Sequence, residues 1–130
     1  MADKILYADD KESLRDFLGT LLEMSFPELD REAFKDGSSL EKRLNESLEG
    51  VRLVITDNDM PGIKGSEIII AYAEKPEFKN ISFILHYGGD PSLGEELVNK
   101  HGAFAYLKKP AQIEDITATI EKALNSNSTK

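Results

Sequence analysis

The sequence predicts an α/β domain in which a parallel sheet lies between two layers of helices. Short apolar segments of strand length alternate along the chain with longer segments whose apolar residues recur at helical spacing. The short segments are apolar almost throughout, as in strands buried on both faces. Strands that alternate with helices pair in parallel through right-handed crossovers. We therefore expect five βα repeats and a three-layer α/β/α sandwich.

Five segments have the length and the β-branched or aromatic content of strands. In chain order they are residues 4–8, 31–35, 51–56, 81–86 and 104–107. The second segment, REAFK, is the most polar of them and gives the weakest signal. The other four are apolar enough to predict strands in the interior of the domain.

Five helices are predicted between and after these strands. Stripes of Leu or Ile at spacings of three and four residues predict helices over residues 14–22, 40–48 and 113–123. Two more are predicted over 66–73 and 92–101, the latter between Pro91 and Gly102, which suit a helix start and stop. Residues 125–130, NSNSTK, are polar and predict a frayed terminus or the stub of a linker, which leaves residues 1–124 as the domain.

Composition bounds the partners and the location. The chain has 130 residues, 40% hydrophobic and 31% charged, as in an ordinary globular domain. Its net charge of −8 argues against binding to nucleic acid or to anionic membrane surfaces. Cysteine is absent, so disulfides and thiolate metal sites are excluded. No apolar stretch resembles a signal peptide or a membrane span, and we expect a cytoplasmic protein.

Charged residues follow three of the predicted strands. Asp9 and Asp10 come after the first strand, Asp57 and Asp59 after the third, and Lys109 after the fifth. In open α/β sheets, ligands bind beyond the carboxyl ends of the strands. We therefore expect these side chains to meet at one edge, although Asp9-Asp10 taken alone is also typical of a helix N-terminus.

Such a cluster predicts a magnesium site. Neighbouring carboxylates repel one another unless a cation neutralises them. Oxygen ligands without histidine or thiolate suit a hard cation such as Mg²⁺. A carboxylate beside Mg²⁺ and a lysine is then placed to attack phosphorus, because both cations stabilise the oxygens of a transferring phosphoryl group.

Three motifs resemble the receiver domain of two-component response regulators, of which the single-domain chemotaxis regulator is a familiar member. They are Asp9-Asp10, Asp57 followed by Met60-Pro61-Gly62, and Lys109-Pro110, each after the matching strand. The resemblance extends over nearly the whole chain. It implies the flavodoxin-like strand order 2-1-3-4-5.

The resemblance also implies residue roles. Asp57 is expected to accept a phosphoryl group from a histidine kinase or phosphotransfer protein. Asp10, Asp57 and the backbone carbonyl of Asp59 are expected to bind Mg²⁺, with Asp9 assisting through water and Lys109 contacting the phosphoryl oxygens. The chain then assists its own phosphorylation and dephosphorylation without being an enzyme on external substrates.

One position departs from the family pattern. Receivers usually carry Ser or Thr at the end of the fourth strand, followed by a small residue. That slot falls at Tyr87, with Gly88 as its small neighbour, or at His86 if the fourth helix is one residue out of step. The family's inward-turning aromatic on the fifth strand is matched by Tyr106. Because the tyrosine hydroxyl lies a ring's length farther from the backbone, we expect an atypical switch.

Other functions fit these residues less well. Asp57-Asn58-Asp59 also resembles the nucleophile motif of haloacid-dehalogenase-type phosphatases, but no second acidic pair follows the lysine. A flavin-binding, flavodoxin-like protein is also disfavoured, because Asp9-Asp10 after the first strand would repel the flavin phosphate. The main alternative is a receiver-like module that binds a protein without phosphorylation. In either case we expect output through the fourth helix, fifth strand and fifth helix.

Overall fold

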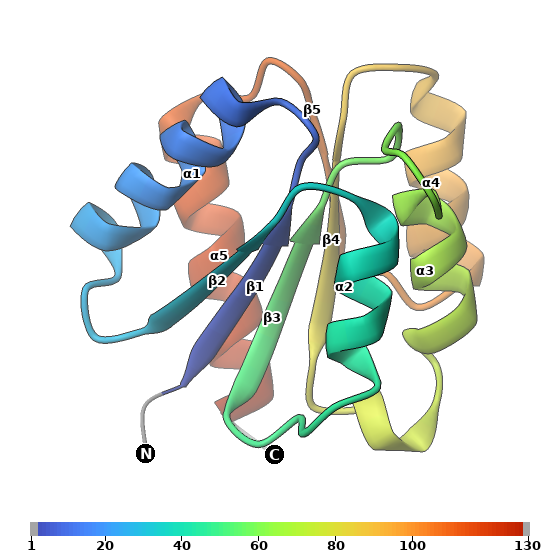
Figure 1. The fold of residues 1–130 in the computed structure, drawn as a ribbon, viewed down its shortest axis with the longest axis horizontal. Helices are drawn as coiled ribbons and strands as arrows, with labels where there is room; N and C mark the ends of the chain where they lie inside the picture. Colours follow the sequence, from blue (N-terminus) through green and yellow to red (C-terminus); the bar gives the residue numbers. More distant parts are fainter. Residues whose placement is uncertain (1–2, 129–130) are drawn as a thin grey trace.

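The computed structural model describes residues 3–128 and contains one five-stranded parallel sheet between two layers of helices (Figure 1). The strands are β1 (Lys4–Ala8), β2 (Asp30–Phe34), β3 (Val51–Thr56), β4 (Ser82–Tyr87) and β5 (Ala105–Lys108). The helices are α1 (Glu12–Ser25), α2 (Gly37–Leu44), α3 (Gly65–Tyr72), α4 (Pro91–Lys100) and α5 (Ile113–Ser128). The sheet order β2-β1-β3-β4-β5 confirms the predicted fold and strand order.

The helices divide between the two faces of the sheet. Figure 1 shows α1 and α5 on one face and α2, α3 and α4 on the other. Each face has its own apolar core. The first contains Leu22 of α1 and Ile120 of α5, and the second contains Leu40 of α2, Ile69 of α3 and Leu97 of α4. The near-continuous apolar strands are explained by this burial on both sides.

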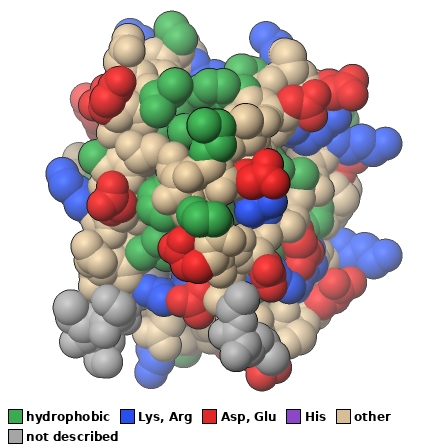
Figure 2. All heavy atoms as spheres, turned by 90° about the vertical axis from the view of Figure 1, so that its left-hand side faces the viewer, with side chains coloured by type: hydrophobic (Ala, Val, Ile, Leu, Met, Phe, Trp, Pro, Cys, Tyr) green, Lys and Arg blue, Asp and Glu red, His purple; other side chains and the backbone are tan. Residues whose placement is uncertain are grey.

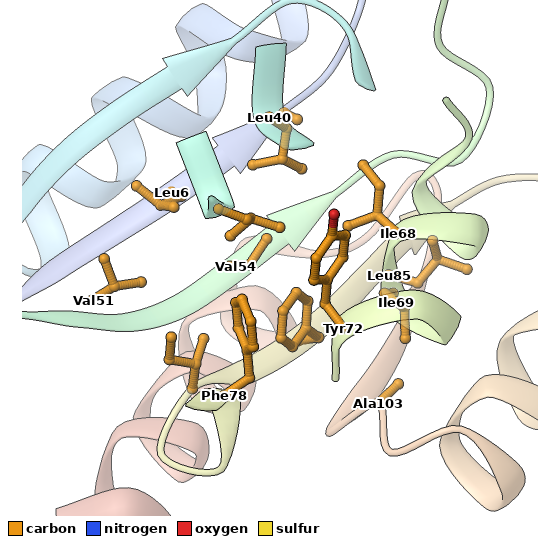
Figure 3. Close-up of a cluster of buried hydrophobic side chains, with 14 of the residues drawn as sticks. Leu6, Leu40, Val51, Val54, Ile68, Ile69, Tyr72, Phe78, Leu85 and Ala103 are labelled. Atoms are coloured by element: carbon orange, nitrogen blue, oxygen red, sulfur yellow. The ribbon is translucent and has the colours of Figure 1, made fainter. Parts of the chain in front are cut away.

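Strand alternation sends neighbouring residues to opposite cores. On β4, Ile84 belongs to the α1/α5 core, whereas Phe83 and Leu85 belong to the α2/α3/α4 core. Figure 3 shows this second core, in which Phe78 lies beside Tyr72. The ring centroids of these two residues are 5.4 Å apart. Phe78 comes from η1 (Pro76–Phe78), a short 3₁₀ helix that the sequence patterns did not predict.

The element boundaries differ from the predictions by a few residues. Tyr87 is the last residue of β4, although the predicted strand ended one residue earlier. Helix α2 ends at Leu44, so Leu48 lies outside the helix that was predicted over residues 40–48. At this end the Asn45 side chain donates a hydrogen bond to the carbonyl of Glu41. Leu48 instead packs against the α2/α3/α4 core from the following loop. An apolar residue at helical spacing can therefore serve the same core from outside the helix.

Helix α5 extends farther than its apolar stripe. It continues to Ser128, into the segment predicted as a polar tail, so residues 125–128 are helical. The Arg52 side chain donates a hydrogen bond to the carbonyl of Leu124 and ties this part of α5 to β3. The rest of the predicted tail lies outside the described residues. Among residues 3–128, no helix is both long and apolar enough to cross a membrane.

Candidate functional site

Parallel pairing brings the first and third strands to the same edge with their acidic residues side by side. The backbone N–H of Asp9 donates to the carbonyl of Phe34 at 3.1 Å, and that of Asp57 donates to the carbonyl of Ala8 at 3.0 Å. Both residues therefore continue the ladder just beyond the strands. Asp9 is fully buried and Asp57 is 7% exposed. These two carboxylates form the floor of the candidate site.

Lys109 lies at the same edge because β5 ends there. Its backbone N–H donates to the carbonyl of Tyr87 at 3.1 Å. Its ammonium lies 2.8 Å from Oδ2 of Asp9 and 3.3 Å from Oδ2 of Asp57. One ammonium thus contacts both buried carboxylates, as expected from the predicted cluster. The following Lys109–Pro110 peptide bond is cis.

A third carboxylate completes an oxygen cluster. Ligand oxygens of Asp9, Asp10 and Asp57 all lie within 4.8 Å of one another, and Asp10 is exposed. Three carboxylates without histidine or thiolate suit Mg²⁺, which binds oxygen and keeps several waters. The exposed side of Asp10 leaves room for those waters. The residues present therefore fit this cation.

The electrostatics of Asp57 also suit a cation. Burial raises the pKa of the Asp57 carboxyl above its usual value, and the nearby Asp9 carboxylate adds to this effect. The Lys109 ammonium and the Asn58 N–H, which donates to Oδ1 of Asp57 at 2.7 Å, act in the opposite direction. A further cation at Asp57 would favour the ionised carboxylate, which is the nucleophilic form.

Asn58 shapes the loop that follows the site. Its side chain is buried, and its Oδ1 accepts the N–H of Ser66 at 2.9 Å, near the start of α3. Its backbone carbonyl accepts the N–H of Gly65 at 3.1 Å. Gly62 has φ of +84°, a conformation that favours glycine. These contacts hold the loop in a tight turn directly after Asp57.

The side chain of Asp59 lies outside the carboxylate cluster. Asp59 is exposed, and its Oδ1 accepts a long hydrogen bond of 3.4 Å from Nδ2 of Asn58. The expected metal contact of Asp59 was its backbone carbonyl, and that contact stays a prediction. Its carboxylate instead adds a negative charge at the rim of the site.

Tyr87 and His86 diverge from the end of β4. Tyr87 packs against the α2/α3/α4 core, and its hydroxyl end covers Gly89, so a side chain at Gly89 would collide with the ring. A Cβ at Gly88 would lie 3.3 Å from the Cβ of Lys109. The small residues at 88 and 89 therefore allow both Tyr87 and Lys109 to approach the loop.

Tyr106 points inward over α4. Its ring packs directly on Gly94, where any side chain would collide with it. Its hydroxyl is buried without a hydrogen-bond partner among the described residues. Burial raises the pKa of Tyr106, with smaller contributions from nearby Tyr87 and Asp90. Tyr106 is therefore half-buried against α4, and its role as the inward-turning aromatic of a switch stays a prediction.

Arg15 of α1 and His86 of β4, the alternative position for the switch residue, also lie near the site. Arg15 of α1 donates from Nη1 to the carbonyl of Asp9 at 2.8 Å. His86 is 4% exposed and lines a pocket together with Leu14 of α1, and its Nδ1 has no hydrogen-bond partner among the described residues. Charged residues are common on helices, so no sequence pattern indicated the contact of Arg15. A single polar residue in an apolar strand is also common, so no pattern indicated the burial of His86.

Comparison with known proteins agrees with this geometry. The family model described as "Response regulator receiver domain" matches residues 5–121. None of the curated proteins matches this chain. Solved structures do match it over almost its full length, including a response regulator receiver domain protein of Clostridium thermocellum, with 26% identity, 98% of each chain covered and a TM-score of 0.86.

Other similar structures belong to proteins of different descriptions. One is a LuxR-family DNA-binding response regulator of Staphylococcus aureus, with 26% identity, coverage of 95% of this chain and 99% of that one, and a TM-score of 0.78. Another is an adenylate cyclase of Rhodopirellula baltica, with 27% identity, coverage of 99% and 92%, and a TM-score of 0.81. Together with the family match over most of its length, these likenesses establish that the chain belongs to the response regulator receiver domain family.

Proposed function

We propose that this receiver domain accepts a phosphoryl group on Asp57 from a histidine kinase or phosphotransfer protein, in a reaction that depends on Mg²⁺. Receiver domains in general exchange signals with such kinases and with downstream targets, and they typically bind Mg²⁺ at an acidic pocket. The observation that carries the proposal is the convergence of Asp9, Asp10 and Asp57 within 4.8 Å, with the Lys109 ammonium 3.3 Å from Asp57.

The chemistry is a phosphoryl transfer between two nucleophiles. A carboxylate oxygen of Asp57 attacks phosphorus and forms an O–P bond, while the N–P bond of the donor phosphohistidine breaks and its nitrogen keeps the electron pair. Bound Mg²⁺ would neutralise the charge on the phosphoryl oxygens. Lys109 moves from the carboxylates to those oxygens, and Asp9 and Asp10 hold the cation beside Asp57.

Output requires that the phosphoryl group change a protein-binding surface. We assign that surface to α4, β5 and α5, where Tyr106 packs against Gly94 of α4. Tyr87 cannot make the short hydroxyl contact of Ser or Thr. The proposed switch therefore uses movement of the Tyr87 ring away from Gly89, which would free space beside Tyr106. Cytoplasmic location stays a prediction from the sequence.

A phosphorylation-independent interaction module is the second candidate. Two observations favour it: Tyr87 replaces the short hydroxyl, and the Tyr106 hydroxyl is already buried without a phosphoryl group. Against it stand the four site residues, because three close carboxylates are costly to keep together without a function. In this case the α4, β5 and α5 face would bind its partner constitutively.

The deciding experiment is intact-mass spectrometry after incubation with Mg²⁺ and acetyl phosphate. We expect a phosphoryl adduct on the parent chain and on Asp59→Asn, whose exposed carboxylate lies outside the cluster. We expect none on Asp57→Asn. The proposal is contradicted if the parent chain forms no adduct although it binds Mg²⁺. Beryllofluoride, a stable mimic of the phosphoryl group, excludes rapid hydrolysis as the cause if it also forms no complex with the chain. That result would favour the interaction module.

A further inference from the structure

A pocket lies beside the candidate site on the α1/α5 face. It has a volume of about 420 Å³, within the usual range of small-molecule sites. Its walls come from α1 and from the connection between β5 and α5, and its lining residues are Leu14, Phe17, His86, Lys109, Pro110 and Ala111. Figure 2 shows hydrophobic side chains gathered in the upper part of this face, with charged side chains around them.

His86 is the unusual member of this lining. It is 4% exposed, and its Nδ1 is one of two buried side-chain N or O atoms of the described residues without a hydrogen-bond partner. A buried nitrogen without a partner costs free energy, whereas an apolar residue at this place would not. His86 lines the pocket, and rotation about Cβ–Cγ exchanges the place of Nδ1 with that of the ring carbon Cδ2.

The charges around the pocket select against ionic ligands. The ammonium of Lys109 lies 2.8 Å from Asp9 and 3.3 Å from Asp57, so an anion in the pocket would have to compete with two carboxylates for it. The Asp9, Asp10 and Asp57 cluster repels an anion further. A cation would meet apolar walls and the Lys109 side chain. Burial and the nearby Lys109 lower the pKa of His86 to about 4, so its ring is neutral at pH 7.

We propose that this pocket, which we call the His86 pocket, binds a small uncharged aromatic molecule that donates one hydrogen bond to the imidazole of His86. The apolar walls would hold the aromatic ring of the ligand, and its donor would bond the imidazole nitrogen that a rotated His86 ring presents to the pocket. The site is separate from the Asp57 carboxylate and does not depend on phosphoryl transfer. Because Lys109 lines the pocket and also contacts Asp9 and Asp57, a ligand would alter the position of that lysine.

The test uses indole as the probe and NMR spectroscopy of the whole, isotope-labelled chain. Indole has the required ring and one N–H donor, and 1-methylindole is a matched ligand without the donor. We expect saturable shifts in Leu14, Phe17, His86 and Ala111, with a dissociation constant of about 1 mM for a ligand of this size. His101, at the end of α4 and 3.5 Å from Glu96, is the internal control and should not shift.

The hydrogen bond is tested by combining the ligand pair with a variant. We expect 1-methylindole to bind about fivefold more weakly than indole, as for loss of one neutral hydrogen bond. In His86→Leu the two ligands should bind equally. Ala111→Trp fills the pocket from its rim and should abolish binding even if His86→Leu folds poorly. Ile70→Ala, at an exposed apolar residue of α3 on the opposite face, should bind like the parent.

Three outcomes would overturn the proposal. The first is the absence of saturable shifts up to the solubility limit of indole. The second is equal binding of indole and 1-methylindole to the parent chain, which would remove the role of His86. The third is tighter binding of indole-2-carboxylate than of indole, which would contradict the preference for an uncharged ligand.

Discussion

The Lys109 ammonium lies closer to Asp9, at 2.8 Å, than to the proposed phosphoacceptor Asp57, at 3.3 Å. The side chain of Asp9 is 1% exposed, and its other oxygen accepts the N–H of Lys11 at 3.0 Å. Lys109 therefore neutralises the most deeply buried acid of the site as well as Asp57. The same lysine has a structural role and, in the proposed function, a chemical one.

Removal of this ammonium should destabilise the fold. Lys109→Met leaves two buried carboxylates without their cation, and we expect a loss of about 1–3 kcal/mol in the free energy of unfolding. Mg²⁺ should restore part of it, because the ion takes over the neutralisation. Urea unfolding with and without MgCl₂ measures both effects. The neighbouring Lys108→Met, at an exposed residue, is the control, and an equal loss in the two variants would contradict the prediction.

Neutralising Asp57 should stabilise the protein when Mg²⁺ is absent. The pKa of Asp57 is raised in the folded state, so folding favours the protonated carboxyl. Stability from this residue is therefore greatest below the unfolded pKa of about 4 and decreases as pH rises through the folded pKa. Asp57→Asn should melt at a higher temperature than the parent at pH 7 in EDTA, and the difference should shrink toward pH 4. Equal or lower melting of the variant at pH 7 would refute this.

Magnesium affinity should depend on the carboxylate of Asp10, inside the cluster, far more than on that of Asp59, outside it. Asp10→Asn removes one of the three clustered carboxylates, and we expect Mg²⁺ to bind about tenfold more weakly or worse, since even outer partners of metal ligands cost this much. Asp59→Asn should change the affinity far less, because only the backbone carbonyl of Asp59 is expected to bind. Isothermal titration calorimetry gives both values. An unchanged affinity in Asp10→Asn would exclude the proposed site.

Gly89 and Tyr87 should be energetically coupled. A methyl group at Gly89 would collide with the hydroxyl end of Tyr87, so Gly89→Ala should cost about 1–3 kcal/mol by displacing the ring. In a Tyr87→Ala background the same substitution should cost much less. Chemical denaturation of the two single variants and the double variant measures this coupling. Additive effects would mean that the ring does not depend on Gly89.

The buried hydroxyl of Tyr106 should contribute nothing to stability. Within residues 3–128 it has no hydrogen-bond partner, so Tyr106→Phe should leave the free energy of unfolding unchanged or raise it by about 1 kcal/mol. Tyr72→Phe is the matched control, because the Tyr72 hydroxyl donates to Glu41 at 2.8 Å and accepts from Asn45 at 3.1 Å. That control should lose about 1–2 kcal/mol. A similar loss in Tyr106→Phe would indicate a partner for its hydroxyl.

The sequence predicted the strands and helices because both cores depend on local periodicity. Alternating apolar segments and leucine stripes are recognised within one element at a time. The most polar predicted strand, residues 31–35, matches the edge strand β2 to within one residue. Boundaries were less predictable. Leu48 has helical spacing yet lies in a loop, and α5 continues beyond its apolar stripe. Polar caps and long-range contacts decide these ends.

By itself, the sequence determined that acids follow two strands and a lysine follows a third, and the parallel sheet then brought these groups to one edge. The tertiary structure alone decided which charges pair. In the folded chain Lys109 pairs with Asp9 as well as with Asp57. The Asp59 carboxylate lies outside the cluster. His86 lines an apolar pocket, away from Tyr87. The reason is that side-chain distances and burial depend on residues far apart in the chain, which no local pattern records.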